Sequence, residues 1–195
     1  MVDGSRRLTR EARRAQILAH GADHFAARPY EQVQMDEVAA SAGVSRALLY
    51  QHFATKRDLF AGVYQQAADG LLEQTRLDPS GPLEPQVVAG LDAHIDYFVA
   101  NRNAVLAANR TLAGDPVIST IIATEMDVLR QRLLEFPALQ HDSAELAASV
   151  LMSWLVFVRV LCVEWLDHGT SSRQQVRDVC VGALIGALHS LESTP

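Results

Sequence analysis

The chain has 195 residues, of which 49% are hydrophobic and 21% are charged, and its formal net charge at pH 7 is −6. This length suits one or two domains, and the apolar content is sufficient for a core, which excludes disorder as the main state of the chain. Gly and Pro are sparse, at 11 and 7 residues. No segment has low complexity, so the composition favours an all-helical protein over a β-sandwich or a barrel.

Features that bear on the cellular compartment favour the cytoplasm. Cys162 and Cys180 stand apart without CxxC spacing, so neither a disulfide framework nor a structural zinc site is expected. The polar, Arg-rich start of the chain lacks the apolar stretch of a secretory signal. The most apolar segment, Val150–Val163, is shorter than the roughly 17 to 25 residues of a membrane span. It also contains Arg159, so it predicts a buried helix.

Charge is distributed unevenly along the chain. Residues 1–60 carry nine basic and seven acidic side chains, whereas the rest of the chain carries eight basic and 16 acidic ones. Such a basic cluster at the start is typical of a surface that meets nucleic acid, but a solvated helix start is an equally good explanation. The clustered side chains are Arg6, Arg7, Arg10, Arg13 and Arg14.

Apolar spacing and capping residues predict four helices within the first 77 residues. Thr9 caps a helix that runs to about residue 27. Two short helices follow at about 35–42 and 45–52, and Ser45 caps the second of them. Thr55 then opens a longer helix, because Asp58 three residues later completes a capping box.

Five further helices are expected beyond the Pro- and Gly-rich loop at residues 78–85. Asp115 is the cap of one of them, with Pro116 at its first helical position. The five helices cover about 17 residues around Leu91 to Phe98, then about 103–112, 116–136, 143–166 and 172–191. The sequence therefore predicts an all-α fold of about nine helices without strands.

The two short helices are joined at Ala42-Gly43-Val44, which makes a helix-turn-helix pattern. A helix of about two turns fits the major groove of DNA, roughly 12 Å wide, with its first residues against the base edges. Gly43 supplies the positive φ that the turn requires. An ordinary pair of packed helices produces the same short pattern, so the wider sequence context decides between them.

The run from Arg14 to Phe60 resembles the amino-terminal domain of the TetR family of transcriptional regulators, over about 47 contiguous residues. Beyond it, the resemblance continues as an arrangement of helices and not as sequence. The positions that carry the resemblance are Phe25, Tyr30, Val38, Ala39, Ala42-Gly43-Val44-Ser45, Leu49-Tyr50, His52-Phe53, Lys56 and Leu59.

The resemblance implies a cytoplasmic, homodimeric regulator and not an enzyme, most simply a repressor that releases a palindromic operator when a small molecule binds. Residues 1–54 would form the DNA-binding helix-turn-helix domain, and residues 55–195 the ligand-binding and dimerisation domain. No cofactor, metal or membrane partner is implied. The alternative is a helical small-molecule-binding or enzymatic protein without DNA function, which would show no preference for a palindrome.

Carried over by position, the second short helix presents its side chains to DNA. Arg46 can pair with guanine, Gln51 with adenine, and the methyl of Ala47 can meet a thymine methyl. Lys56, the single lysine beside 16 arginines, suits a phosphate, although a solvated lysine is the alternative. Gln34 stands where the family usually has Thr. This replacement weakens the cap of the first short helix, but the longer Gln side chain can still reach a phosphate. The expected DNA-binding residues are Gln34, Ser45, Arg46, Ala47, Tyr50, Gln51, His52 and Lys56.

The resemblance also implies a ligand cavity among the helices of residues 60–165. Arg159 lies inside an apolar run and needs a partner or water, because an unpaired buried charge is unfavourable. An acidic residue of a neighbouring helix or a ligand carboxylate would satisfy it, and we favour the internal ion pair. For the aromatic and Met candidates, plain core packing is the alternative. The expected ligand-binding residues are His94, Phe98, Arg110, Met126, Met152, Trp154, Phe157 and Arg159.

The last helix carries a face of small residues, which lets another helix approach closely. We expect this face, together with the preceding helix, to form the dimer interface, and packing within one subunit is the alternative. A two-fold axis would place the two recognition helices about 34 to 36 Å apart, so the operator should be a palindrome. The expected interface residues are Gly182, Ala183, Ile185 and Gly186.

Two other constellations are discounted. His20 and His24 lie one helical turn apart beside Asp23, but Gly21 stands where an HExxH metal site needs Glu. The two cysteines have no basic neighbour in the sequence that would activate a thiol. We therefore expect neither a metal site nor a redox-active cysteine.

Overall fold

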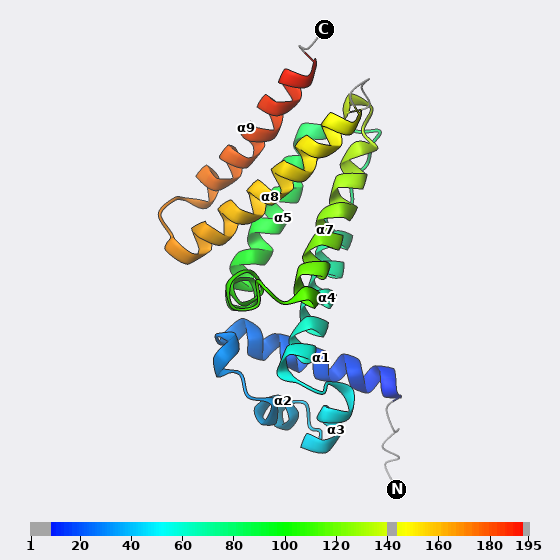
Figure 1. Cartoon of the computed structure of the whole chain (residues 1–195), viewed down its shortest axis with the longest axis vertical. Coiled ribbons are helices and arrows are strands. Elements are labelled where there is room, and N and C mark those ends of the chain that lie inside the picture. Colours follow the sequence, from blue (N-terminus) through cyan, green and yellow to red (C-terminus); the bar gives the residue numbers. More distant parts are fainter. Residues whose placement is uncertain (1–8, 140–143, 193–195) are drawn as a thin grey trace, which may run out of the picture.

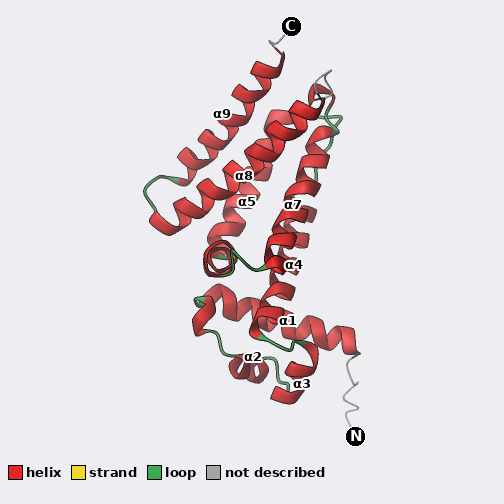
Figure 2. Ribbon diagram, in the orientation of Figure 1, coloured by secondary structure: helices red, strands yellow, loops and turns green. Residues whose placement is uncertain are grey.

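The computed structural model describes residues 9–139 and 144–192 of the chain. Within these residues it contains nine α-helices and no strand, so the expected all-α fold is confirmed (Figures 1 and 2). The helices are α1 (Arg10–Ala27), α2 (Met35–Ser41), α3 (Arg46–His52), α4 (Lys56–Gln74), α5 (Leu83–Ala100), α6 (Arg102–Leu106), α7 (Pro116–Leu134), α8 (Ala144–His168) and α9 (Arg173–Glu192). Arg6, Arg7 and the expected helix start at Ser143 lie outside the described residues.

Hydrogen bonds at the helix starts confirm the predicted caps. The hydroxyls of Thr9 and Ser45 accept from the backbone N–H three residues on, at 3.1 and 3.2 Å. At the start of α4, Thr55 and Asp58 form both halves of the capping box. Asp115 caps α7 by accepting from the first two free N–H groups of that helix. These caps fix where α1, α3, α4 and α7 begin.

The turn between α2 and α3 adopts the expected conformation. Gly43 has a φ of +62°, in the left-handed region that favours glycine. The N–H of Val44 donates to the carbonyl of Ala39 at 3.0 Å, which closes the end of α2. The chain therefore turns sharply enough to place α3 against α2.

A first hydrophobic core joins α1, α2 and α3 to the first half of α4, in the lower part of Figure 1. The rings of Phe25 and Phe60 meet edge to face with centroids 5.0 Å apart. The same cluster also includes Ala107 and Ile118, which follow much later in the chain. The expected boundary between residues 54 and 55 stays a prediction, because the packing is continuous across it.

A second core is formed by the long helices α5, α7, α8 and α9, which run side by side in the upper part of Figure 1. Helix α8 packs on both α7 and α9, and α5 closes the bundle against α9. The fully buried side chains Ile95, Leu151 and Leu184 come from three of these helices. Helix α4 reaches from the first core into this bundle and connects the two halves.

One element differs from the expectation. The helix expected at about 103–112 ends at Leu106 and continues as one π-helical turn over Ala107–Thr111, where the N–H of Leu112 donates to the carbonyl of Ala107 at 2.8 Å. Single π turns inside helices often occur at functional sites, because they redirect side chains. Here the turn contains Asn109, whose side chain contacts Arg159 of α8.

Helix α8 is longer than the apolar run that predicts it. Among the described residues, Glu145–His168 is the one stretch long and apolar enough to cross a membrane by length and composition, a test that core helices also pass. In the structure this helix packs between α7 and α9. Its Arg159 is buried and forms an ion pair with Glu125, as expected of a core helix with a satisfied charge.

Candidate DNA-binding surface and candidate ligand cavity

Helix α3 turns one face into the core and the other to solvent. Leu49 and Phe53, one turn apart, are buried at 0% and 3% exposure and anchor the helix. The residues expected to meet DNA are on the opposite side, since Ser45, Arg46, Ala47, Tyr50 and Gln51 are all exposed. A short helix held by two apolar residues, with its polar face free, has the geometry that major-groove recognition requires.

Arg46 is held over this face by two neighbours. Its Nη1 donates to Asp36 Oδ2 of α2 at 2.9 Å. Its guanidinium carbon also lies 5.5 Å from the centroid of the Tyr50 ring, which is a cation–π contact. The side chain is extended along the exposed surface of α3, and 67% of it remains accessible.

The start of α2 lacks a side-chain cap, as expected for Gln34. The Gln34 side chain makes no capping hydrogen bond and is exposed, although its carbonyl accepts from Glu37 and Val38, each at 3.2 Å. The acidic residues of the first turn, Asp36 and Glu37, are favourable near the positive end of the helix dipole. Within residues 9–139 and 144–192, no hydrogen bond therefore holds the Gln34 side-chain amide.

The end of α3 lies beside the basic start of α1. Burial lowers the pKa of the His52 imidazole, and the positive charges of Arg10, Arg14 and Arg13 lower it further. The Arg14 guanidinium lies 4.9 Å from the centroid of the Phe53 ring. These contacts place the described arginines of the basic cluster next to the carboxy-terminal end of α3.

The ammonium group of Lys56, for which a phosphate contact is predicted, is held by backbone carbonyls in this structure. Its Nζ donates to the backbone carbonyls of Tyr30, Glu31 and Val33 at 2.9, 3.2 and 3.1 Å. The same atom lies 4.6 Å from the centroid of the Tyr30 ring. An ammonium group has three N–H bonds, and all three have partners inside the protein. Lys56 therefore fastens α4 to the turn before α2.

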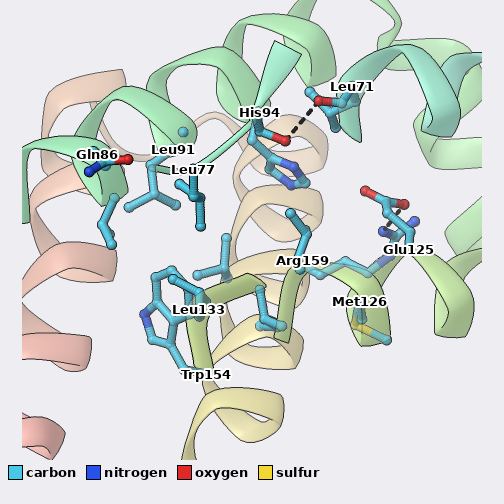
Figure 3. A pocket seen from close by; sticks show the side chains of 16 residues that line it. Leu71, Leu77, Gln86, Leu91, His94, Glu125, Met126, Leu133, Trp154 and Arg159 are labelled. Atoms are coloured by element: carbon cyan, nitrogen blue, oxygen red, sulfur yellow. Dashed lines mark hydrogen bonds and ion pairs between the residues drawn. The ribbon is translucent and has the colours of Figure 1, made fainter. Parts of the chain in front are cut away.

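A cavity lies in the second half of the molecule, lined by residues of α4, α5, α7 and α8 (Figure 3). Counted together with the open solvent at its mouth, the space between these helices amounts to about 680 Å³. Four expected ligand-binding residues line it, namely His94, Met126, Trp154 and Arg159. Most of the remaining wall is apolar: Leu71, Leu77, Val87, Leu91, Leu129, Leu133, Leu155 and Val158.

The four other expected residues do not line this cavity, and their role in ligand binding stays a prediction. Phe98 is buried behind His94, with ring centroids 4.1 Å apart. Arg110 is on the surface, where it pairs with Glu164 and lies 3.7 Å from Asp167. Phe157 faces outward from α8 and is 38% exposed. The sequence does not reveal this, because α8 is apolar on every side and its composition does not distinguish the exposed side from the buried one. Met152 is half-buried elsewhere on α8.

Arg159 has the internal acidic partner that we favoured. Its Nη1 lies 3.5 Å from Glu125 Oε2 of α7, its Nε donates to Asn109 Oδ1 at 2.9 Å, and its Nη2 donates to the Tyr64 hydroxyl. Burial raises the pKa of Glu125, while the Arg159 charge opposes this shift. Sequence reasoning missed Glu125, although its position on the apolar face of α7, four residues after Ile121 and three after Ile122, was a usable signal.

His94 has an unsatisfied nitrogen at the cavity. Its Nε2 is buried and has no hydrogen-bond partner among the described residues. Burial, assisted by the Arg159 charge, lowers the pKa of His94 to about 3. The imidazole is therefore neutral near pH 7. Figure 3 shows its ring pointing into the space that Arg159 and Leu91 also face.

The His24 and Cys162 side chains of the discounted constellations have partners within the protein. His24 Nε2 lies 3.0 Å from the Ser41 hydroxyl, so it has a local partner. No group of three metal-ligating side chains occurs in the described part of the chain. Cys162 and Cys180 are buried on adjacent helices, and a hydrogen bond to Cys180 together with burial raises the pKa of the Cys162 thiol.

The outer faces of α8 and α9 remain apolar and exposed. Val160 and Val179 are 55% and 53% exposed. A Cβ atom placed on Gly182 or Gly186 would meet no atom within 4 Å. Packing within the subunit therefore does not require these glycines to be small. Ala183 is exposed beside them and Ile185 is half-buried.

Comparison with known proteins agrees with this geometry. Residues 17–63 match the family model "Bacterial regulatory proteins, tetR family". The HTH-type transcriptional activator FasR of Mycolicibacterium smegmatis is 43% identical over 94 residues, which cover 47% of this chain and 43% of FasR. The HTH-type transcriptional repressor BepR of Brucella suis is 29% identical over 182 residues, covering 83% of this chain and 81% of BepR.

A solved structure extends the likeness to the whole fold. The crystal structure of a tetR-family transcriptional regulator from Streptomyces coelicolor has a TM-score of 0.80 at 22% sequence identity, and the match covers 94% of this chain and 85% of that one. The fold and the exposed face of α3 define a helix-turn-helix DNA-binding protein. Residues 17–63 are thus similar to the TetR family of transcriptional regulators, and the relatives named here are transcriptional regulators.

Proposed function

We propose that the protein is a cytoplasmic, homodimeric repressor that binds a palindromic operator and releases it when a small molecule enters the cavity. The observation that carries this proposal is the division of α3 into two faces. Leu49 and Phe53 are buried, whereas Arg46 and Gln51 are exposed on the opposite side, where they can pair with guanine and adenine.

The proposed dimer uses the exposed apolar face of α8 and α9. Val156, Phe157 and Val160 are exposed on α8, and Val179 is exposed on α9. Contiguous exposed apolar surface marks an interaction site, and the open space at Gly182 allows a partner helix to approach closely. A two-fold axis through this face would duplicate the recognition helix, which explains why a palindrome is expected.

Helix α4 is the proposed connection between the cavity and the DNA-binding surface. Its first turns lie in the amino-terminal core through Leu59, and its last turns line the cavity through Leu71. At its start, Arg57 Nη1 donates to Asp115 Oδ2 of α7 at 3.1 Å. A ligand that shifts α4 relative to α7 would therefore tilt α3, which changes the spacing of the recognition helices in the dimer.

The proposal is tested by selecting bound fragments from random DNA with the purified protein. A palindrome with half-sites about one helical turn apart is expected, and its binding should weaken as salt is raised. The alternative, a helical small-molecule-binding protein without DNA function, predicts that no palindrome is enriched.

The direction of regulation needs a second measurement. A reporter placed behind the selected operator should fall in expression when this protein is present. FasR is an activator and BepR is a repressor, so a rise in reporter expression would keep the DNA-binding proposal and overturn repression.

A further inference from the structure

The polar groups of the cavity wall differ in how well they are satisfied. The hydroxyl of Thr75 donates to the carbonyl of Leu71 at 2.8 Å, and the Gln86 amide nitrogen donates to the carbonyl of Asp78, also at 2.8 Å. Both side chains are therefore occupied by nearby backbone. Three polar side chains remain that can decide which ligand is accepted, namely His94, Glu125 and Arg159.

Arg159 is not a free anion receptor. Each of its three guanidinium nitrogens has a partner on a different element, which are Asn109 of the π turn, Glu125 of α7 and Tyr64 of α4. Asn109 is itself fixed, because its Nδ2 donates to the carbonyl of Val105 at 2.8 Å. A ligand carboxylate would have to displace one of these partners to reach the guanidinium.

The Glu125–Arg159 pair also balances the charge of the cavity. Glu125 is 5% exposed and Arg159 is 7% exposed, so both charges are shielded from water. A ligand carboxylate would add a second negative charge beside Glu125, and a ligand ammonium would add a second positive charge beside Arg159. In a site with little water, either like-charge contact is strongly unfavourable. The pair therefore favours an uncharged ligand.

His94 carries a cavity-wall nitrogen without a hydrogen-bond partner in the described structure. Its Nε2 is the single cavity-wall atom of the described chain that is buried without a partner, and leaving such a group unpaired is unfavourable. A neutral imidazole nitrogen either donates or accepts, depending on which ring nitrogen carries the proton. A hydroxyl group serves both forms, because it can donate and accept.

We propose that the cavity binds an uncharged, largely apolar molecule whose hydroxyl group hydrogen-bonds to His94 Nε2, and that the Glu125–Arg159 pair excludes carboxylate and ammonium analogues. This assignment rests on the proposed function in taking the cavity as the effector site. It adds the chemical class of the effector and identifies Glu125 as the residue that determines charge selectivity.

The test compares three headgroups on the same hydrocarbon tails. The ligands are the straight-chain alcohols, carboxylates and amines of 6 to 12 carbons. Binding is followed by the fluorescence of Trp154 in a Trp165→Phe background, since Trp154 lines the cavity and Trp165 does not, and is repeated on the unaltered chain by titration calorimetry. We expect the best alcohol to bind at least tenfold more tightly than the carboxylate and the amine of equal length. Equal or tighter binding of either charged series overturns the proposal, as does the absence of alcohol binding at every length.

Two variants assign the selectivity to its residues. Glu125→Gln keeps the size of the side chain and leaves Arg159 without a counter-charge, so carboxylate binding should strengthen at least tenfold relative to alcohol binding. His94→Phe should weaken alcohol binding about tenfold, the effect of one lost buried hydrogen bond. The matched control is Asp127→Asn, which removes an acid from the solvent side of α7 that pairs with Arg130, and it should alter neither series.

A measurement on the unaltered chain covers the case in which Glu125→Gln does not fold. If a carboxylate enters only by displacing Glu125, that residue must take up a proton. Calorimetry in two buffers of different ionisation enthalpy should then show proton uptake with the carboxylate and none with the alcohol. Tight carboxylate binding without proton uptake would contradict the role of Glu125.

Operator binding separates this inference from the proposed function. If alcohols bind with the expected selectivity and leave operator affinity unchanged, the ligand class stands and ligand-responsive regulation fails. If carboxylates release the operator and alcohols do not, regulation stands and the ligand class fails.

Discussion

Arg46, the first residue of α3, forms an ion pair with Asp36 in the first turn of α2, with 2.9 Å between Nη1 and Oδ2. Both side chains are mostly exposed, so the pair contributes little to stability. Its consequence concerns DNA instead. In the proposed complex Arg46 exchanges the Asp36 carboxylate for a base edge, and the freed carboxylate then faces the phosphates.

Replacing Asp36 by Asn should therefore strengthen binding to DNA of any sequence. Removal of one negative charge near the phosphates is expected to raise non-specific affinity about fivefold, equal to about 1 kcal/mol at low salt. The measurement is fluorescence anisotropy with a selected operator and a scrambled duplex. Glu73→Gln is the matched control, because this exposed acid lies at the far end of α4. Weaker binding by the Asp36→Asn variant would mean that Asp36 positions Arg46.

Replacing Arg46 by Ala should affect specificity more than general affinity. A lost bidentate contact to guanine is worth roughly 1 to 3 kcal/mol at one base pair per half-site. Competition with operators altered at single positions measures this difference. An equal loss on every sequence would make Arg46 a contact to the DNA backbone.

The exposed face of α3 could be predicted from the sequence because its determinants are local. The Ser45 cap, the positive φ of Gly43 and the spacing of Leu49 and Phe53 fix which side of α3 is exposed, and all lie within about ten residues of one another. Lys56 illustrates the limit of such reasoning. Its carbonyl partners are 23 to 26 residues away, and nothing in its own neighbourhood identifies them.

The cavity was predicted less completely because its walls depend on how distant helices pack. The spacing within α8 does not distinguish Trp154, which lines the cavity, from Phe157, which faces outward, since nearly every position between them is apolar. The need of Arg159 for a partner was evident from the sequence. The identity of that partner was not, because Glu125 lies 34 residues earlier on another helix.

The role of Lys56 predicts a loss of stability without a change in DNA contacts. Lys56→Met should lower the free energy of unfolding by about 2 to 4 kcal/mol, because carbonyls that accept from a charged group lose their partner. Urea denaturation measures this loss. The dependence of operator affinity on salt should be unaltered, whereas the exposed residue Arg14, changed to Gln, should reduce that slope by about one. A weaker dependence of operator affinity on salt in Lys56→Met would instead indicate that Lys56 contacts a phosphate.

His94 should make stability depend on pH. Its pKa is about 3 in the folded chain and 6.5 when it is unperturbed, so the unfolded chain binds a proton below pH 6.5 while the folded chain does not. The free energy of unfolding should then fall by about 1.4 kcal/mol for each pH unit below 6.5 until the folded pKa is reached. His94→Leu removes this contribution. Urea denaturation at pH 8, 6 and 5 should therefore show the free energy of unfolding of the variant rising relative to that of the unaltered chain as pH falls. A constant difference between the two would show that His94 is protonated in the folded state.

The proposed dimer interface predicts that assembly and folding respond in opposite directions to one substitution. Gly182→Leu introduces a side chain where a Cβ atom meets nothing within 4 Å, so the subunit should fold, with a gain of up to about 1 kcal/mol from helix propensity. The same side chain would separate the two subunits, so sedimentation should show a monomer that binds single half-sites weakly. Gly70→Leu is the control, since its Cβ position on α4 is also open but lies away from α8 and α9. A Gly182→Leu protein that remains dimeric would place the interface on another face, because a leucine at the centre of the proposed contact cannot be accommodated without separating the helices.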